Sequence, residues 1–148
     1  MKSGARTRGL PGRSNLVLDS YAMIGYLENE TFSDKVQDLL FEARDGIVTL
    51  YFHMIHLGEV YYITLREQGQ TLADLAYSRI KSLPLLLVDS INEELLRKAA
   101  TLKALHPISY ADSFAAALAM IKKCPLLTGD PEFSSLEKKD ILRIEWLR

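Results

Sequence analysis

Apolar residues in this chain fall into two alternating patterns. Short continuous runs predict strands at 15–18, 47–50, 85–88 and 126–127, and a short alternating run predicts a strand at 141–146. The stretches between them carry apolar residues every three or four positions, which is the period of a helix with one buried face. These stretches predict helices at 21–28, 33–46, 51–68, 71–82, 90–105 and from 109 onward. Strands and helices therefore alternate along the chain.

The alternation predicts an α/β fold with a mostly parallel sheet of four or five strands and right-handed crossovers. The run at 85–88 is continuously apolar, which is typical of a parallel strand covered on both faces. The run at 141–146 alternates apolar and polar residues and predicts an edge strand. Capping residues support several helix starts: Ser33, Thr71, Ser109, and Ser90 with Glu93 in the spacing of a capping box.

Composition limits the protein class. A chain of 148 residues with 48% hydrophobic and 25% charged residues is long enough for one domain with a sizeable core, and it is neither a disordered nor a membrane composition. No apolar run reaches the length of a membrane span. The single cysteine, Cys124, excludes an internal disulfide and fits a reducing compartment such as the cytoplasm. We therefore expect a single cytoplasmic domain at 15–148 with no membrane partner.

Charge adds little about partners. The net charge of −1 gives no general attraction to nucleic acid, so any basic binding surface has to be local. The basic side chains within the domain that fit this role are scattered along the sequence: Arg66, Arg79, Lys81, Lys122 and Lys123. Residues 1–14 differ, because they contain four basic residues, no acid and no apolar stretch. We expect them to be a disordered basic tail or an expression remnant, and not a secretory signal.

Three acidic residues occupy similar places in the predicted fold. Asp19 follows the first strand, Asp112 lies at the start of the last long helix, and Asp130 follows the strand after that helix, in a Thr-Gly-Asp-Pro turn. In a parallel α/β sheet, the carboxyl ends of strands and the first turns of helices face one edge, where ligands bind. Glu59, within the helix at 51–68, is a less secure fourth member of this group.

Each acid also has a simpler interpretation. Ser109 and Asp112 have the spacing of a helix cap, which on pattern alone is the favoured explanation of Asp112. Asp130 suits a turn, Asp19 suits an N-cap that Ser20 would serve equally well, and Glu59 suits a helix surface. His53 and His56 have a spacing that a metal can use, but with no third soft ligand we interpret them as surface or packing residues.

Carboxylates gathered in one cleft repel one another, and a hard divalent cation removes this conflict. One cysteine and three histidines are too few for the usual zinc sites. A site made only of acids instead points to Mg²⁺ or Mn²⁺, which take oxygen ligands. The typical work of these ions is to orient a water and stabilise charge on a phosphodiester.

Four segments, in order, resemble the acidic motifs of PIN domains, in particular those of VapC-type toxins from toxin–antitoxin pairs. The segments are Leu-Val-Leu-Asp-Ser-Tyr-Ala (16–22), Leu-Gly-Glu-Val-Tyr-Tyr (57–62), Ile-Ser-Tyr-Ala-Asp-Ser-Phe-Ala-Ala-Ala-Leu-Ala (108–119) and Leu-Leu-Thr-Gly-Asp-Pro-Glu-Phe (126–133). The last two are the most specific. The resemblance covers the chain from about residue 15 to its end.

The resemblance implies a three-layer PIN fold and an endoribonuclease that depends on Mg²⁺ or Mn²⁺. It assigns Asp19, Glu59, Asp112 and Asp130 as metal-binding catalytic acids, with Ser20 and Thr128 as polar neighbours that orient the site. It further implies a homodimer inhibited by a cognate antitoxin. Two alternatives stay open: a PIN-like binding or assembly module without catalysis, and a DNA-directed nuclease of the same fold.

Overall fold

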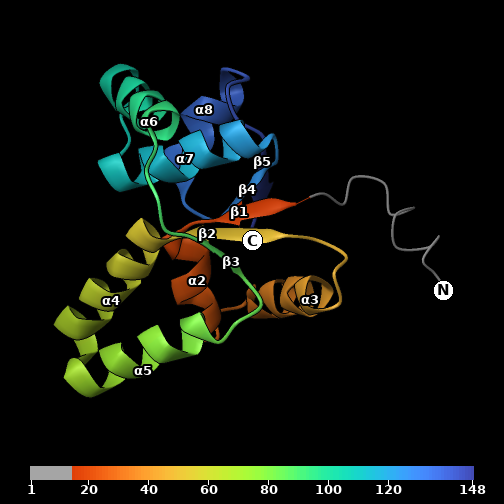
Figure 1. Ribbon diagram of the computed structural model, residues 1–148, viewed down its shortest axis with the longest axis vertical. Coiled ribbons are helices and arrows are strands. Elements are labelled where there is room, and N and C mark those ends of the chain that lie inside the picture. Colours follow the sequence, from red (N-terminus) through yellow and green to blue (C-terminus); the bar gives the residue numbers. More distant parts are fainter. Residues whose placement is uncertain (1–14) are drawn as a thin grey trace.

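The computed structural model describes residues 15–148, so the prediction for residues 1–14 lies outside the described part of the chain. Its centre is a five-stranded sheet in which every pairing is parallel, in the order β3-β2-β1-β4-β5 (Figure 1). The strands are β1 (Leu16–Leu18), β2 (Leu50–His53), β3 (Leu86–Val88), β4 (Leu126–Thr128) and β5 (Ile144–Trp146). The predicted α/β class with a parallel sheet is confirmed.

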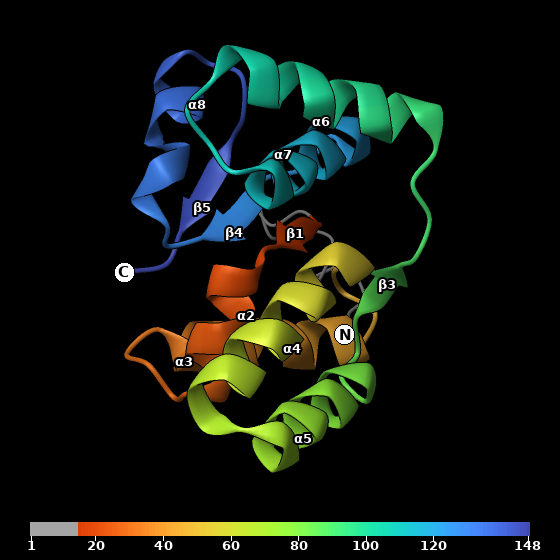
Figure 2. The same cartoon turned by 90° about the vertical axis from the view of Figure 1, so that its left-hand side faces the viewer.

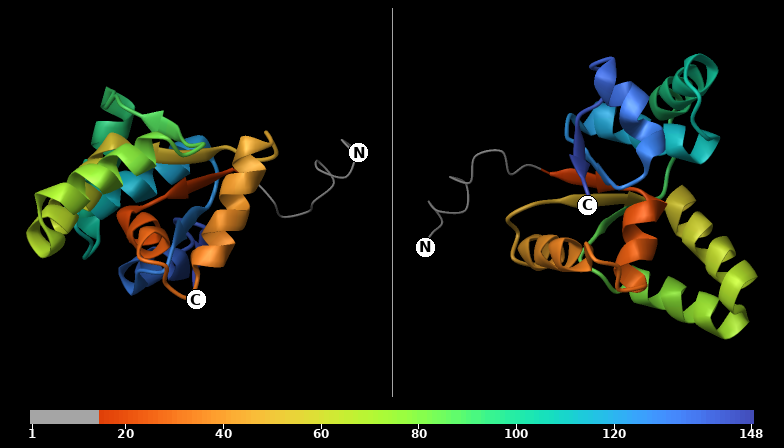
Figure 3. Two further views of the ribbon diagram at one scale, coloured as in Figure 1. Left: turned by 90° about the horizontal axis from the view of Figure 1, so that it is seen from below. Right: turned by 180° about the vertical axis from the view of Figure 1, so that it is seen from behind.

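Helices cover both faces of this sheet, which makes the predicted three layers (Figure 2). They are α2 (Ser20–Leu27), α3 (Ser33–Arg44), α4 (Met54–Gln68), α5 (Gln70–Lys81), α6 (Glu93–Leu105), α7 (Tyr110–Lys122) and α8 (Ser134–Lys138), with a 3₁₀ turn η1 (Pro131–Phe133). Side chains of β1 alternate between the two layers, as a strand requires: Leu16 and Leu18 pack with α2 and α3, and Val17 packs with α6 and α7. α4 and α5 pack together and extend beyond the sheet (Figure 3).

The strand order creates a switch point between β1 and β4. From β1 the chain continues to β2 and β3 on one side, then returns through α6 and α7 to place β4 on the other side of β1. Leu18 lies beside Leu127 in this pairing, so both strands end at the same level. Loops diverge at such a point and leave a crevice beyond the carboxyl ends of the strands.

Two element predictions near the second strand are wrong. β2 spans Leu50–His53 and not 47–50, and α4 begins at Met54 and not at residue 51. The apolar run continues past Leu50 through Tyr51 and Phe52, whose pattern suits a strand and a helix equally well. The tertiary pairing of Leu16 with Leu50 decides the register, and the His53 Nδ1 atom, which accepts a hydrogen bond from Ile55 N at 3.0 Å, sets the helix start.

The run at 85–88 also differs from its prediction. β3 pairs only with β2 and lies at the edge of the sheet, and Leu86 is 48% exposed. Its apolar composition is therefore not a sign of cover on both faces. Three predicted caps are wrong as well. Asn92 and not Ser90 caps α6, Gly69 and not Thr71 precedes α5, and the Ser33 hydroxyl donates to Asn29.

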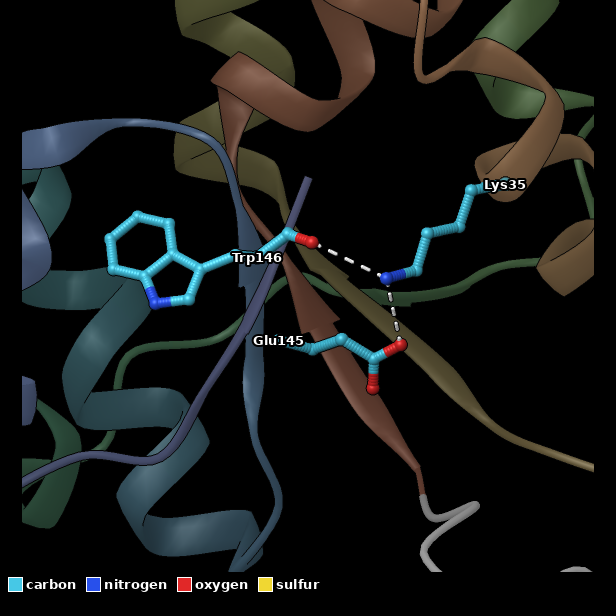
Figure 4. A network of polar contacts seen from close by, with 3 residues as sticks. All are labelled: Lys35, Glu145 and Trp146. Carbon is cyan, nitrogen blue, oxygen red and sulfur yellow. Dashed lines mark hydrogen bonds and ion pairs between the residues drawn. The ribbon is translucent and has the colours of Figure 1, made fainter. Parts of the chain in front are cut away.

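The opposite edge of the sheet, strand β5, is bound to helix α3 by polar contacts. The Lys35 ammonium of α3 lies 3.2 Å from the Glu145 carboxylate and donates to the Trp146 carbonyl at 3.3 Å (Figure 4). β5 is the predicted edge strand, although it is shorter than 141–146. These contacts hold the last strand against α3, close to the end of the chain.

Candidate metal centre

Asp19 lies directly beyond β1 and is almost completely buried. One carboxylate oxygen, Oδ1, caps α2 by accepting from Ala22 N at 2.9 Å. The other, Oδ2, accepts from the Thr128 hydroxyl at 2.5 Å. The Asp19 pKa is raised to about 7, first of all by burial: the hydrogen bonds from Thr128 and Ala22 lower it, and the charges of Asp130 and Glu59 add to the rise.

Thr128, the last residue of β4, connects two of the acids. While its hydroxyl donates to Asp19, the same oxygen accepts from Asp130 N at 3.0 Å. Asp130 then caps the 3₁₀ turn, because its Oδ1 accepts from Glu132 N at 2.9 Å. The ends of β1 and β4 are thus tied together across the switch point by a buried hydroxyl.

Asp112 reaches this place from the first turn of α7. Ser109 caps the helix as predicted, with its Oγ accepting from Asp112 N at 3.1 Å, so the cap uses the Asp112 backbone and leaves its carboxylate free of that role. Oxygens of Asp112, Asp130 and Glu132 lie within 4.8 Å of one another. Burial raises the Asp112 pKa to about 8, together with the charges of Asp19, Asp130 and Glu132.

Glu59 approaches from the middle of α4 and is half-buried. Its Oε1 atom is buried and has no hydrogen-bond partner among residues 15–148. Burial raises the Glu59 pKa, and a hydrogen bond with Ser20 lowers it. The Glu59 charge is one of those that raise the Asp19 pKa, so Glu59 lies close to Asp19.

The structure therefore brings the four predicted acids to one edge of the sheet, with Ser20 and Thr128 beside them. It also adds Glu132, which the sequence analysis treated only as part of a turn. The available signal was its position two residues after Asp130. A 3₁₀ turn directs both side chains to one place, but a carboxylate in an exposed turn is too common to stand out before the fold is known.

The two histidines are not part of this cluster. His53 Nδ1 caps α4 and its Nε2 lies 3.0 Å from the Ser90 carbonyl oxygen, while His56 Nε2 lies 2.9 Å from the Ala111 carbonyl oxygen. Both rings are buried, which corrects the expectation of surface residues but agrees with a packing role. Burial lowers the His56 pKa to about 4, so this ring is neutral at pH 7.

The donor set fits a hard divalent cation. All candidate ligands are carboxylate oxygens, and the pKa values of Asp19 and Asp112 are raised first by burial and then by the charges of neighbouring carboxylates. Glu59 Oε1 is an additional buried acceptor without a donor. A divalent ion bound by oxygens would compensate each of these, and no soft ligand competes for it.

A parallel α/β domain with an acidic cluster at its switch point is the class that fold and site define. The family model of the PIN domain matches residues 16–139, and the chain belongs to this family. The resemblance noted for the four acidic segments is therefore confirmed at the level of the family.

Solved structures share the fold at low sequence identity. VapBC2 from Rickettsia felis bound to a promoter DNA fragment has a TM-score of 0.71 at 14% identity, covering 92% of this chain and 100% of that chain. VapBC-1 from nontypeable Haemophilus influenzae has a TM-score of 0.66 at 18% identity, covering 91% of this chain and 98% of that chain. VapC20 from Mycobacterium tuberculosis is described as a toxin that cleaves the sarcin-ricin loop. It has a TM-score of 0.64 at 15% identity, covering 82% of this chain and 94% of that chain.

A search of curated protein sequences gives no match to this chain. Within residues 15–148, no helix combines the length and apolar character needed to cross a bilayer.

Proposed function

We propose that this protein is a metal-dependent endoribonuclease, the toxin of a VapBC-type toxin–antitoxin pair. The observation that carries the proposal is the convergence of five carboxylates from four segments of the chain on one edge of the sheet, at the starts of α2 and α7, within α4 and at the turn η1. Two of them, Asp19 and Asp112, have pKa values raised to about 7 and about 8. Such a cluster is costly without a bound cation, so its presence favours a metal-binding role over a purely structural one.

In this proposal Asp19, Glu59, Asp112 and Asp130 are the metal-binding acids, with Glu132 beside them. When bound, Mg²⁺ or Mn²⁺ would lower the pKa of a coordinated water and stabilise negative charge on the phosphodiester. Thr128 holds Asp19 Oδ2 in place and Ser20 contacts Glu59. The Glu59 Oε1 atom is buried without a hydrogen-bond partner among residues 15–148, and it would be a further oxygen ligand of the ion.

The substrate and partners rest on the structural neighbours. VapC20 is described as a toxin that cleaves the sarcin-ricin loop, and this favours RNA over DNA as the substrate. The VapBC neighbours are complexes of a toxin with its antitoxin. These neighbours support a cognate antitoxin as partner. We further propose a homodimer as the assembly, as the resemblance to VapC-type toxins implies, and the cytoplasm as the place of action, which the single cysteine fits.

The test is cleavage of labelled single-stranded RNA and DNA in Mn²⁺ and in EDTA. We expect RNA to be cut only with the ion, and Asp112→Asn to abolish cleavage. Asp38→Asn, a matched change at an exposed position of α3, should retain it. Cleavage that persists in EDTA or in Asp112→Asn would exclude the metal mechanism. Preferential cleavage of DNA would favour the DNA-directed nuclease. If neither nucleic acid is cut, the result would favour the binding module.

A further inference from the structure

Two buried histidines join the start of α4 to the other layer of the fold. His53 and His56 lie one helical turn apart, and their rings meet edge to face with centroids 6.4 Å apart. Each Nε2 atom lies within hydrogen-bond distance of a backbone carbonyl oxygen, Ser90 for His53 and Ala111 for His56. Ser90 lies between β3 and α6, and Ala111 lies in the first turn of α7.

The hydrogen bonds fix where the His56 proton lies. A carbonyl oxygen only accepts, so Nε2 carries the hydrogen and donates it to Ala111 over 2.9 Å. Nδ1 is then an acceptor, and it is buried without a donor among residues 15–148. An unpartnered buried acceptor destabilises the fold, and an apolar ring at this position would avoid that cost. The Nε2–H donor is therefore the feature that an apolar ring could not supply.

The hydrogen bond from His56 to Ala111 lies close to two of the acids, both in sequence and on the helices that carry them. Ala111 immediately precedes Asp112, so its carbonyl is part of the peptide unit that also carries the Asp112 N–H. The same peptide N–H is held by Ser109 Oγ at 3.1 Å. On the other side of the bond, His56 lies three residues before Glu59 on α4, close to one helical turn away. One hydrogen bond thus connects the helix that presents Glu59 to the helix that presents Asp112.

We propose that His56 is a positioning residue, whose Nε2–H bond to the Ala111 carbonyl fixes the first turn of α7 relative to α4 and so sets the spacing of Asp112 and Glu59. The inference rests on the proposed function for the role of these acids, but the fixing of α7 is independent of it. Groups that orient metal ligands from behind commonly change metal affinity by about 10- to 100-fold when they are removed.

The chain offers its own matched control. His53 is also buried, lies on the same helix start and donates to a carbonyl, but its partner Ser90 is distant in sequence from every acid of the site. His53→Asn keeps a side chain that caps helices well and removes the Ser90 bond. His56→Phe and His56→Leu remove the donor at position 56, and His56→Gln retains a donor at a similar reach.

Three measurements on the full chain test the proposal. The first is amide hydrogen exchange of the first turn of α7 in EDTA, which needs no metal. The second is Mn²⁺ affinity, from the electron paramagnetic resonance signal of free Mn²⁺, and the third is RNA cleavage. We expect His56→Phe and His56→Leu to speed exchange at 110–114 at least fivefold and to weaken Mn²⁺ binding about tenfold. His56→Gln should recover most of both, and His53→Asn should match the wild type.

The outcomes separate the two proposals. Wild-type exchange rates at 110–114 in either donor-less variant that folds would overturn the positioning role, so the test holds even if the other variant unfolds. An equal effect of His53→Asn would overturn it as well, because the cause would then be general loosening of α4. If the wild type binds no Mn²⁺ and cuts no RNA, the proposed function fails, and the exchange measurement still decides whether His56 fixes α7.

Discussion

Replacing Asp112 by asparagine should stabilise the metal-free protein at neutral pH. In the absence of a cation, burial and the charges of Asp19, Asp130 and Glu132 raise the Asp112 pKa from 3.8 to about 8. The folded protein then keeps a proton on this carboxyl at pH 7, and an asparagine amide imitates the protonated acid in size and in its ability to donate. Asp112→Asn thus removes the cost of the titration while keeping the shape.

The sign and size follow from proton linkage. Between pH 4 and 8 the unfolded Asp112 releases its proton while the folded one retains it, so the free energy of unfolding of the wild type falls as pH rises through this window. At pH 7 the difference from 3.8 corresponds to about 4 kcal/mol, at about 1.4 kcal/mol per pH unit. Asp112 is not fully enclosed, so solvent screening reduces this to about 2 kcal/mol.

Urea unfolding in EDTA at pH 4 and pH 7 measures this effect. We expect Asp112→Asn to gain about 2 kcal/mol over the wild type at pH 7 and almost nothing at pH 4. Asp38→Asn, at an exposed position, should stay within about 0.5 kcal/mol at both. Added Mn²⁺ should reverse the order at pH 7, because only the wild type gains from tight binding. A variant less stable than the wild type at pH 7 in EDTA would refute the reasoning.

Two further changes probe the switch point. An Ala Cβ at position 129 would lie 2.5 Å from the Tyr21 ring and 2.9 Å from the Leu147 carbonyl oxygen, so Gly129→Ala should cost about 1–3 kcal/mol in urea unfolding. Gly58→Ala, in open space on α4, should instead stabilise by up to about 1 kcal/mol, and equal effects of the two would contradict this account. Thr128→Val removes the donor to Asp19 and should raise the Asp19 pKa and weaken Mn²⁺ binding, whereas Thr128→Ser should preserve both, as titration followed by NMR would report.

The sequence predicts the layers of the fold better than the ends of its elements. The alternation of apolar runs with helical periods is a property of whole segments, and it was sufficient for the parallel sheet. The boundary near residue 50 depends instead on which residues pair across the sheet. Leu50, Tyr51 and Phe52 suit a strand and a helix alike, and the pairing with Leu16, which lies far away in the sequence, decides the outcome. Likewise, nothing in the apolar composition of β3 distinguishes an edge from a centre.

The site residues also fall into those whose places follow from the sequence and those whose places do not. The places of Asp19 and Asp130 follow from their positions after the ends of β1 and β4, once these two strands are neighbours in the sheet. Glu59 depends on how α4 crosses the sheet, and its periodicity is obscured by the tyrosines beside it. Glu132 depends on a 3₁₀ turn that turn composition alone does not reveal. What the sequence leaves undetermined is the direction of side chains on helices and turns, since that direction is fixed by packing.

The simpler interpretations of these acids and the functional one turn out to be compatible. Asp19 caps α2 with one oxygen and presents the other to Thr128, and Asp130 caps its turn with Oδ1 alone. At Asp112 the cap comes from Ser109 and uses only the backbone N–H. A helix start holds its first turn in a fixed place through such bonds, and a carboxylate has a second oxygen to offer. Capping therefore supplies the rigidity that a metal-binding carboxylate needs. A capping role for an acid at a helix start does not exclude a metal-binding role for the same residue.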